Sequence, residues 1–495
     1  MQTLYQSWTR RHIGAGVAIL SILLNLMFNP FHLENIPMRM SNVALLMLGC
    51  WIFELLPMPV VALFPIVLFP LLGIESLGKT AAPYADPVIF LFMGGFFIAL
   101  AIEKWGLHKR IAMNIIARTG MKGNQILLGF MVATFMISMW ISNTATTLMM
   151  FPIVLSVLKV IQHQYKPDEL AKLQTALLLS IAYASNIGGL ATIVGTPPNT
   201  AYVGYALQNL NIRISFFEWT LICFPIALLI LYMIYLAFTK WLFRGQQEIS
   251  SEAENYLLGI KRALGPWTQP EKRVMLIFLA AAFLWMTKDV WVYLFKLDLS
   301  DTGIAIFCAI LLFVIPSGSS ETNLTDTDFS SDKSSYLLTW EDTHKMAWGI
   351  LILFGGGLTM AKGLESTGIM QRIGDFLAAY APNQLVWLIF MVAVISILLS
   401  EVMSNIAQVM IMAPILTSVS YTLELNPLIL GIPMTLAASC AGMLPMGTPP
   451  NAIVFSSGKI PLSSMLKVGL VINVISVIMI TLLTYCLIPI LTGTR

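Results

Sequence analysis

Two short polar patterns each occur twice in this strongly apolar sequence of 495 residues. The first is Ser-Asn followed by Thr or Ile, at 142–144 and again at 404–406. The second is Gly-Thr-Pro-Pro-Asn, at 195–199 and again at 447–451. The paired prolines remove backbone N–H donors and clash with the preceding helical turn, while the glycines permit unusual backbone angles. The second pattern therefore predicts a break inside a helix.

A broken helix leaves backbone carbonyls without partners, and these oxygens have a specific chemistry. Sodium is a hard cation that takes several oxygen ligands, which freed carbonyls and Ser and Asn side chains supply together. The N-terminal ends of half-helices and the Thr and Asn donors suit the carboxylate of an anion. A single copy of either pattern reads equally well as a kink or a helix cap, but the duplication of both favours a binding site.

The composition indicates what kind of secondary structure carries these patterns. The chain is 57% hydrophobic and 11% charged, whereas a soluble domain carries about 25% charged residues. We therefore predict an all-α, multi-pass membrane protein. The apolar run 13–28 follows basic residues and has no small-residue cleavage site after it, so we expect a retained first span. The five cysteines have no metal-ligand or disulfide spacing.

Two apolar runs, 124–161 and 384–420, are nearly twice the roughly 20 residues of one span. Each has a polar stretch at its midpoint, formed by one of the Ser-Asn patterns. The first midpoint carries no charge, Gly or Pro, unlike a turn exposed to water. Two spans joined by a turn remain possible, but we favour a re-entrant hairpin whose tip lies inside protein at mid-membrane depth.

Basic residues indicate the side of the membrane on which each hairpin opens. They flank the first hairpin on both sides: Lys109, Arg110, Arg118, Lys122, Lys159, Lys166 and Lys172. The second hairpin has none in its flanks. By the positive-inside rule the first opens to the cytoplasm and the second to the outside. The same rule predicts a cytoplasmic N-terminus and an external C-terminus in the cell (inner) membrane.

The two halves of the chain align as a repeat. A shift of 262 residues places 91–111 over 353–373 and 142–153 over 404–415, and a slightly smaller shift places 194–203 over 446–455. Since the hairpins open to opposite sides, the repeats have inverted topology, which is typical of secondary transporters. An ion channel and a membrane-embedded enzyme are the alternatives. No nucleophile–base pair, metal cluster or nucleotide fingerprint is present, so we predict that the chain is not an enzyme.

This interpretation divides the chain into four parts. They are residues 1–40 (N-terminus and first span), 41–245 (repeat one, with hairpin 124–161 and broken helix 172–206), 246–273 (cytoplasmic linker) and 274–495 (repeat two, with polar loop 316–347, hairpin 384–420 and broken helix 427–457).

Ionisable residues are few in the apolar runs. The carboxylates at membrane depth are Glu54, Glu103, Glu365 and Glu401. Glu401 lies three residues before Ser404, and we expect it to support the hairpin rather than couple a cation or sense protons. Lys362 is the main basic residue within these runs. An anion site would therefore depend on helix ends, amides, hydroxyls and co-bound sodium, because burying unpaired charge is costly.

From about residue 40 to 490, the paired Ser-Asn tips and paired Gly-Thr-Pro-Pro-Asn breaks resemble the divalent anion:sodium symporter family of di- and tricarboxylate carriers. The resemblance implies eleven spans plus two re-entrant hairpins, a homodimer with a central scaffold, and an elevator-type movement of the transport domain. It implies no covalent cofactor and two or more sodium ions as coupling ions.

The resemblance also implies site residues. The first sodium site would use Ser138, Ser142, Asn143 and Gly195, and the second Ser400, Met403 (backbone), Asn405 and Gly447. The substrate would contact Asn143, Thr144, Thr196, Asn405, Ile406 and Pro449.

The second tip departs from the family pattern, because Ile406 stands where the dicarboxylate carriers have threonine. Isoleucine donates no hydrogen bond, and one lost bond costs about 0.5–1.5 kcal/mol. Similar apolar replacements occur in citrate-preferring relatives. We expect sodium-coupled symport of a C4-dicarboxylate such as succinate, malate or fumarate. Citrate, 2-oxoglutarate or sulfate as main substrate, and sodium-independent exchange, are the alternatives.

Overall fold

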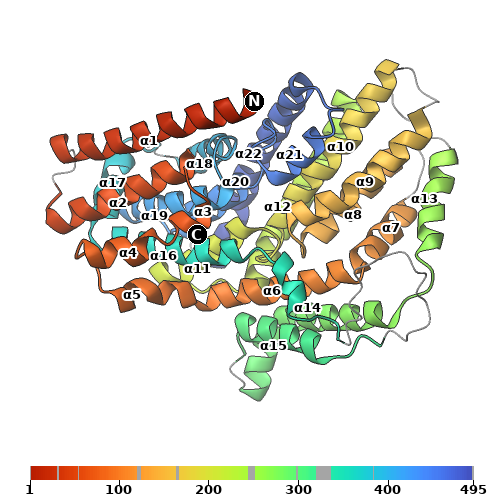
Figure 1. Cartoon of the computed structure of the whole chain (residues 1–495), viewed down its shortest axis with the longest axis horizontal. Coiled ribbons are helices and arrows are strands. Elements are labelled where there is room, and N and C mark those ends of the chain that lie inside the picture. The colour runs from red at the N-terminus through yellow and green to blue at the C-terminus, as the bar shows by residue number, and fades with distance from the viewer. Residues whose placement is uncertain are drawn as a thin grey trace.

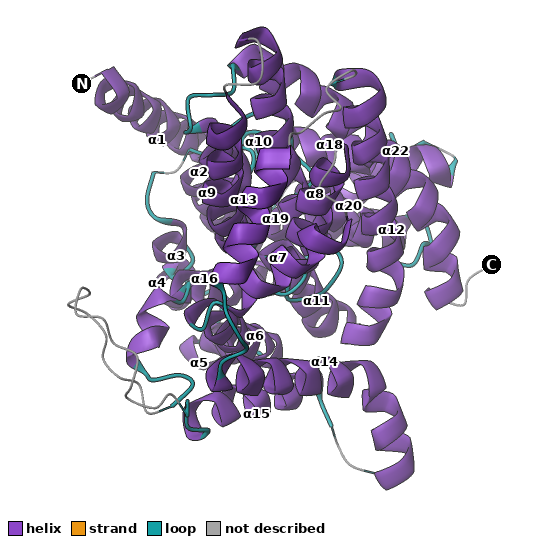
Figure 2. Ribbon diagram, turned by 90° about the vertical axis from the view of Figure 1, so that its right-hand side faces the viewer, coloured by secondary structure: helices purple, strands orange, loops and turns teal. Residues whose placement is uncertain are grey.

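The computed structural model describes residues 2–29, 33–53, 55–119, 124–162, 167–243, 251–296, 299–318, 336–382 and 384–492. Most of these residues are helical, as Figure 2 shows. Within the described ranges the only β-type pairing is an isolated antiparallel bridge between Pro316 and Tyr336. The predicted all-α fold is confirmed.

The helices of the first half are α1 (Gln2–Phe28), α2 (Asn35–Ile52), α3 (Met58–Val61), α4 (Phe64–Leu71), α5 (Leu77–Ala81), α6 (Pro87–Lys104), α7 (Leu107–Thr119), α8 (Asn124–Ser138), α9 (Asn143–Ile161), α10 (Pro167–Leu190), α11 (Pro197–Leu210) and α12 (Phe216–Ala237). Those of the second half are α13 (Ser251–Ala263), α14 (Gln269–Phe295), α15 (Asp301–Val314), α16 (Trp348–Ser366), α17 (Ile369–Ala378), α18 (Leu385–Ser400), α19 (Asn405–Thr422), α20 (Leu428–Ala438), α21 (Pro449–Phe455) and α22 (Leu462–Thr492).

Five helical stretches of the described chain are long and apolar enough to cross a membrane: Leu77–Lys104, Asn143–Val160, Glu169–Leu190, Phe216–Leu242 and Leu462–Leu487. Other apolar helices are shorter, among them α8, α15, α18 and α20. The apolar segment 58–74 forms two short helices, α3 and α4. The number of about eleven spans stays a prediction.

Each Ser-Asn pattern lies at the turn between two helices. Residues 139–142 join α8 to α9, and residues 401–404 join α18 to α19. Ser142 forms the N-cap of α9, where its Oγ accepts a hydrogen bond from the N–H of Ala145 at 3.3 Å. Such a cap satisfies one of the N–H groups that the first helical turn leaves free.

Each Gly-Thr-Pro-Pro-Asn pattern begins a new helix after a break. The first break separates α10, ending at Leu190, from α11, beginning at Pro197. The second separates α20, ending at Ala438, from α21, beginning at Pro449. Proline is favoured in the first turn, where its missing N–H has no intrahelical acceptor. The two prolines thus set where each second half-helix starts.

The two halves of the chain pack crosswise around these turns and breaks. Within each half, α8 packs on α10 and α18 packs on α20. Between the halves, α9 packs on α21, α19 packs on α11, and α12 packs on α22. Figure 1 shows α8, α9, α10, α12 and α21 to the right of α2. The turn between α8 and α9 therefore lies near the break between α10 and α11 and near α21 of the second half. The turn between α18 and α19 lies near the break between α20 and α21 and near α11 of the first half.

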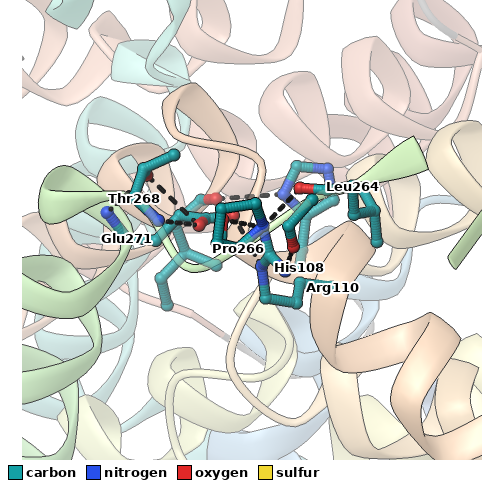
Figure 3. Close-up of polar contacts among 8 residues, drawn as sticks. His108, Arg110, Leu264, Pro266, Thr268 and Glu271 are labelled. Atoms are coloured by element: carbon teal, nitrogen blue, oxygen red, sulfur yellow. Dashed lines mark hydrogen bonds and ion pairs between the residues drawn. The ribbon is translucent and has the colours of Figure 1, made fainter. Parts of the chain in front are cut away.

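A buried arginine fixes the connection between α13 and α14 to α7 (Figure 3). Arg110 donates through Nε to Glu271 Oε1 at 2.8 Å, and through its terminal nitrogens to the carbonyls of Leu264, Gly265 and Pro266. Burial raises the pKa of Glu271, but the hydrogen bonds from Arg110 and Thr268 outweigh it and hold that pKa below its ordinary value. The described part of the predicted linker is therefore attached to the first half.

The expectation that Lys362 is the main basic residue within the apolar runs is wrong. Lys362 is exposed, whereas Lys288 of α14 is buried and bonds both carboxylate oxygens of Asp301, at 2.9 and 3.0 Å. Asp301 Oδ2 also accepts a hydrogen bond from the N–H of Phe216 at 3.3 Å. A charge inside an apolar region needs such partners. The pair joins α14 to α15.

The predicted polar loop 316–347 is partly packed. Residues 319–335 of it, and the candidate carboxylate Glu54, lie outside the described residues. Leu337 donates its N–H to the carbonyl of Ile315 at 3.0 Å. Asp342, in a short 3₁₀ turn η4 (Glu341–Lys345), pairs with Lys104 at 2.6 Å. The last residues of this loop are thus held against the end of α6.

Candidate functional site

A cavity of about 1490 Å³ lies where the turns and the breaks of both halves meet. All the predicted substrate contacts line it: Asn143, Thr144, Thr196, Asn405, Ile406 and Pro449. Of the predicted sodium ligands, Ser142, Met403 and Gly447 also line it. Ser138, Gly195 and Ser400 do not line it and are buried. The structure thus gathers most of the predicted site residues around one space.

Ser138 and Asn143 form a compact oxygen cluster behind the first tip. The fully buried Ser138 Oγ lies 2.7 Å from Asn143 Oδ1 and 2.8 Å from the carbonyl oxygen of Ser185. A hydroxyl carries one proton, so Ser138 can satisfy only one of these two acceptors at a time. In this orientation three oxygen atoms, Ser138 Oγ, Asn143 Oδ1 and the Ser185 carbonyl oxygen, lie close together, and oxygens are the ligands that a hard cation takes.

The second tip repeats this cluster at the shift of 262 residues. Ser400 Oγ lies 2.7 Å from Asn405 Oδ1 and also contacts the carbonyl oxygen of Ala438. Ser400, like Ser138, is fully buried. The same grouping of three oxygen atoms therefore occurs at both tips, each against the first half of its own broken helix.

The asparagine of each break binds carbonyls that the break leaves free. Asn199 Nδ2 donates to the carbonyls of Gly189 (2.9 Å) and Thr192 (2.8 Å). Asn451 Nδ2 donates to those of Ala441 (3.0 Å) and Leu444 (3.3 Å), at a shift of 252 residues. Some of the carbonyls that the sequence offered as ion ligands are therefore already bonded within the protein. We had not predicted this role for either asparagine.

Glu401 connects the second tip to the second break. The carboxylate is buried and accepts hydrogen bonds from the N–H groups of Met443 and Leu444, each at 2.8 Å, and from Asn473 Nδ2 at 2.8 Å. Met139 occupies the corresponding position of the first tip, where its backbone carbonyl accepts from Thr192 Oγ1. These contacts agree with the expected supporting role of Glu401.

Charged residues reach the cavity from only one direction. Among the described lining residues, the charged ones are Glu103, Lys109 and Lys345, and all three are exposed. Burial lowers the pKa of the neighbouring His108, on α7, so its ring is neutral near pH 7. Within the described chain the tips and breaks supply amides, hydroxyls and helix N-termini to the cavity, and no charged side chain. The charge of a bound anion would have to be compensated mainly by bound cations.

Two other candidate carboxylates, Glu365 and Glu103, are exposed rather than buried among the tips and breaks. Glu365 is exposed, and its Oε2 accepts a hydrogen bond from Asn209 Nδ2 at 2.7 Å. Glu103 lies at the exposed end of α6. Sequence position alone had placed both at membrane depth.

Comparison with known proteins gives a consistent result. The family described as "Sodium:sulfate symporter transmembrane region" matches residues 7–492. The sodium-dependent dicarboxylate transporter SdcS of Staphylococcus saprophyticus is 35% identical over 481 residues, which cover 96% of this chain and 91% of that protein. SdcS of Staphylococcus aureus (strain USA300) is 36% identical over 498 residues, covering 97% and 92%.

Among solved structures, the crystal structure of the YdaH transporter of Alcanivorax borkumensis has a similar fold. The TM-score is 0.54, with 13% sequence identity, and the match covers 84% of this chain and 87% of that chain. At this identity the similarity concerns the fold alone.

Proposed function

The chain belongs to the family of the sodium:sulfate symporter transmembrane region, and from that premise we propose that it is a secondary transporter carrying a di- or tricarboxylate together with sodium ions. Its curated relatives are transporters rather than enzymes. Because they are described as sodium-dependent dicarboxylate transporters, a C4-dicarboxylate is the leading substrate. Citrate or sulfate, sodium-independent exchange, and channel activity are the alternatives.

The observation that carries the proposal is the Ser–Asn oxygen cluster that occurs once at each tip beside the cavity. Each cluster places a serine Oγ 2.7 Å from an asparagine Oδ1. Two such clusters of closely spaced oxygen atoms support two sodium sites. The substrate carboxylates would lie between them, against the N-termini of the half-helices.

The mechanism we propose is an elevator-type movement in which the two re-entrant hairpins and the two broken helices move as one part. The repeats would be inverted, with eleven spans, the N-terminus in the cytoplasm and the C-terminus outside the cell (inner) membrane. A homodimer would supply the fixed scaffold. The crosswise packing of α9 on α21 and α19 on α11 supports this, since it joins the site-bearing helices of both halves into one unit.

The direct test is uptake of labelled succinate into proteoliposomes containing the purified protein. With an inward sodium gradient we expect uptake that falls at least about tenfold when choline replaces sodium, because the site would lose its compensating cations. Uptake that ignores sodium but requires a dicarboxylate inside the vesicle would identify an exchanger instead. Competition by a panel of unlabelled anions would rank succinate, malate, citrate and sulfate.

Gly189 offers a test of the first sodium site without altering a ligand. A Cβ at this position would lie 2.4 Å from Asn143 Oδ1, which is far inside ordinary contact. Gly189→Ala should therefore displace the amide and raise the sodium concentration for half-maximal uptake by about tenfold or more. Gly259→Ala is the matched control, because a Cβ there meets no atom within 4 Å. Equal sodium dependence in the two variants would count against the site.

A further inference from the structure

Asn186 connects the two halves of the site. It lies in α10, is 2% exposed, and lines the cavity. Its Nδ2 donates to Thr448 Oγ1 at 2.9 Å and lies 3.5 Å from Asn451 Oδ1. Thr448 is the N-cap of α21. One amide of the first half thus reaches the break of the second.

The orientation of the Asn186 amide follows from its neighbour. Asn451 donates through Nδ2 to the carbonyls of Ala441 and Leu444, so its Oδ1 is the atom that faces Asn186. If the Asn186 amide were rotated by 180°, its Oδ1 would face Asn451 Oδ1, and neither oxygen has a proton to donate. The nitrogen therefore faces Asn451. The other atom, Asn186 Oδ1, is buried and has no hydrogen-bond partner among the described residues.

A buried amide oxygen without a donor is costly, and a ligand that supplies a donor would remove that cost. An ionised carboxylate has no proton to give, but a hydroxyl has one. The position is also close to the predicted substrate contacts. Ser185, the preceding residue, donates through Oγ to the backbone carbonyl of Asn143 at 2.7 Å, and Thr448 directly precedes Pro449.

We propose that Asn186 is a substrate-specificity residue whose Oδ1 accepts a hydrogen bond from the hydroxyl of a 2-hydroxydicarboxylate. This inference rests on the proposed function and deepens it, because it names malate-type acids as preferred over succinate. Succinate has the same two carboxylates but leaves Asn186 Oδ1 without a donor. A site that bonds a substrate hydroxyl discriminates against the analogue lacking it. One hydrogen bond corresponds to a preference of about threefold to tenfold.

The test compares malate and succinate as competitors of labelled succinate uptake into proteoliposomes under an inward sodium gradient at pH 7.5, where both acids are ionised. In the unaltered protein we expect malate to inhibit at a concentration about threefold to tenfold lower than succinate. In Asn186→Ala the two inhibition constants should become equal. Asn186→Leu is a second variant of closer volume.

A control separates recognition from packing. Thr448→Val removes the partner of Asn186 Nδ2 but leaves Oδ1 in place, so it should keep the malate preference whatever its maximal rate. Equal inhibition constants in the unaltered protein, or a preference that survives both Asn186 substitutions, would overturn the proposal. A changed half-saturating sodium concentration with an unchanged malate preference would also overturn it, because Asn186 Oδ1 would then serve a cation. Absence of sodium-dependent uptake of either acid would instead reject the proposed function itself.

Discussion

Replacing Asn143 or Asn405 by alanine is expected to abolish sodium-driven uptake, with Vmax/KM falling at least about 100-fold in each variant. Each asparagine contributes its Oδ1 to the oxygen cluster of its tip, 2.7 Å from a buried serine hydroxyl. Each also lies at the first turn of its helix and lines the cavity. Under the proposed function, alanine would remove an ion ligand and a substrate donor together, and each charge-assisted interaction is worth about 1.5–3 kcal/mol.

Asn114→Ala is the matched control for this prediction. Asn114 lies in α7 and does not line the cavity, so its replacement should leave uptake near that of the unaltered protein. The variants should be compared in proteoliposomes at equal protein content, after size-exclusion chromatography shows that each is folded. Full uptake by Asn143→Ala or Asn405→Ala would remove that residue from the site.

The second large effect is expected at Glu401. Glu401→Ala leaves three donors without an acceptor: the N–H groups of Met443 and Leu444, and Asn473 Nδ2. Each unsatisfied buried donor costs about 1–3 kcal/mol. We expect a lower melting temperature in detergent and uptake reduced at least about tenfold. Glu401→Gln keeps one acceptor oxygen. Its melting temperature and uptake should therefore lie between those of Glu401→Ala and those of the unaltered protein.

Glu75→Ala provides the comparison, because Glu75 pairs with Lys79 at 3.5 Å in an exposed position where ion pairs contribute little. Its melting temperature and uptake should match those of the unaltered protein. If Glu401→Gln keeps the melting temperature but changes the sodium dependence of uptake, the carboxylate acts on a cation instead of supporting the tip.

The positions of the turns and breaks were predictable because local chemistry determines them. Adjacent prolines cannot continue a helix, so α11 and α21 begin at the Pro-Pro pairs. Ser142 and Ser404 precede α9 and α19 as N-caps. The all-helical fold followed from the apolar composition, and the clustering of the predicted site residues followed from the repeat.

Side-chain contacts between distant residues were not predictable from local pattern. The asparagine of each break matched the chemistry of an ion or substrate ligand. In the structure, however, Asn199 donates to the carbonyl of Gly189 and Asn451 donates to that of Ala441. Lys288 was overlooked because its partner, Asp301, lies on the next helix. Asn186 gave no signal in an apolar stretch, since only the crossing of α10 and α21 brings it to Thr448.

The central claim, that a carboxylate and sodium move together, is tested most directly by steady-state accumulation of labelled malate or succinate in proteoliposomes. The sodium concentration ratio across the membrane should be varied while the total ionic strength is held constant. We expect the inside-to-outside ratio of the acid to rise with the sodium ratio and to collapse when a sodium ionophore is added. An accumulation ratio that stays at unity for every sodium ratio, with transport otherwise active, would contradict it.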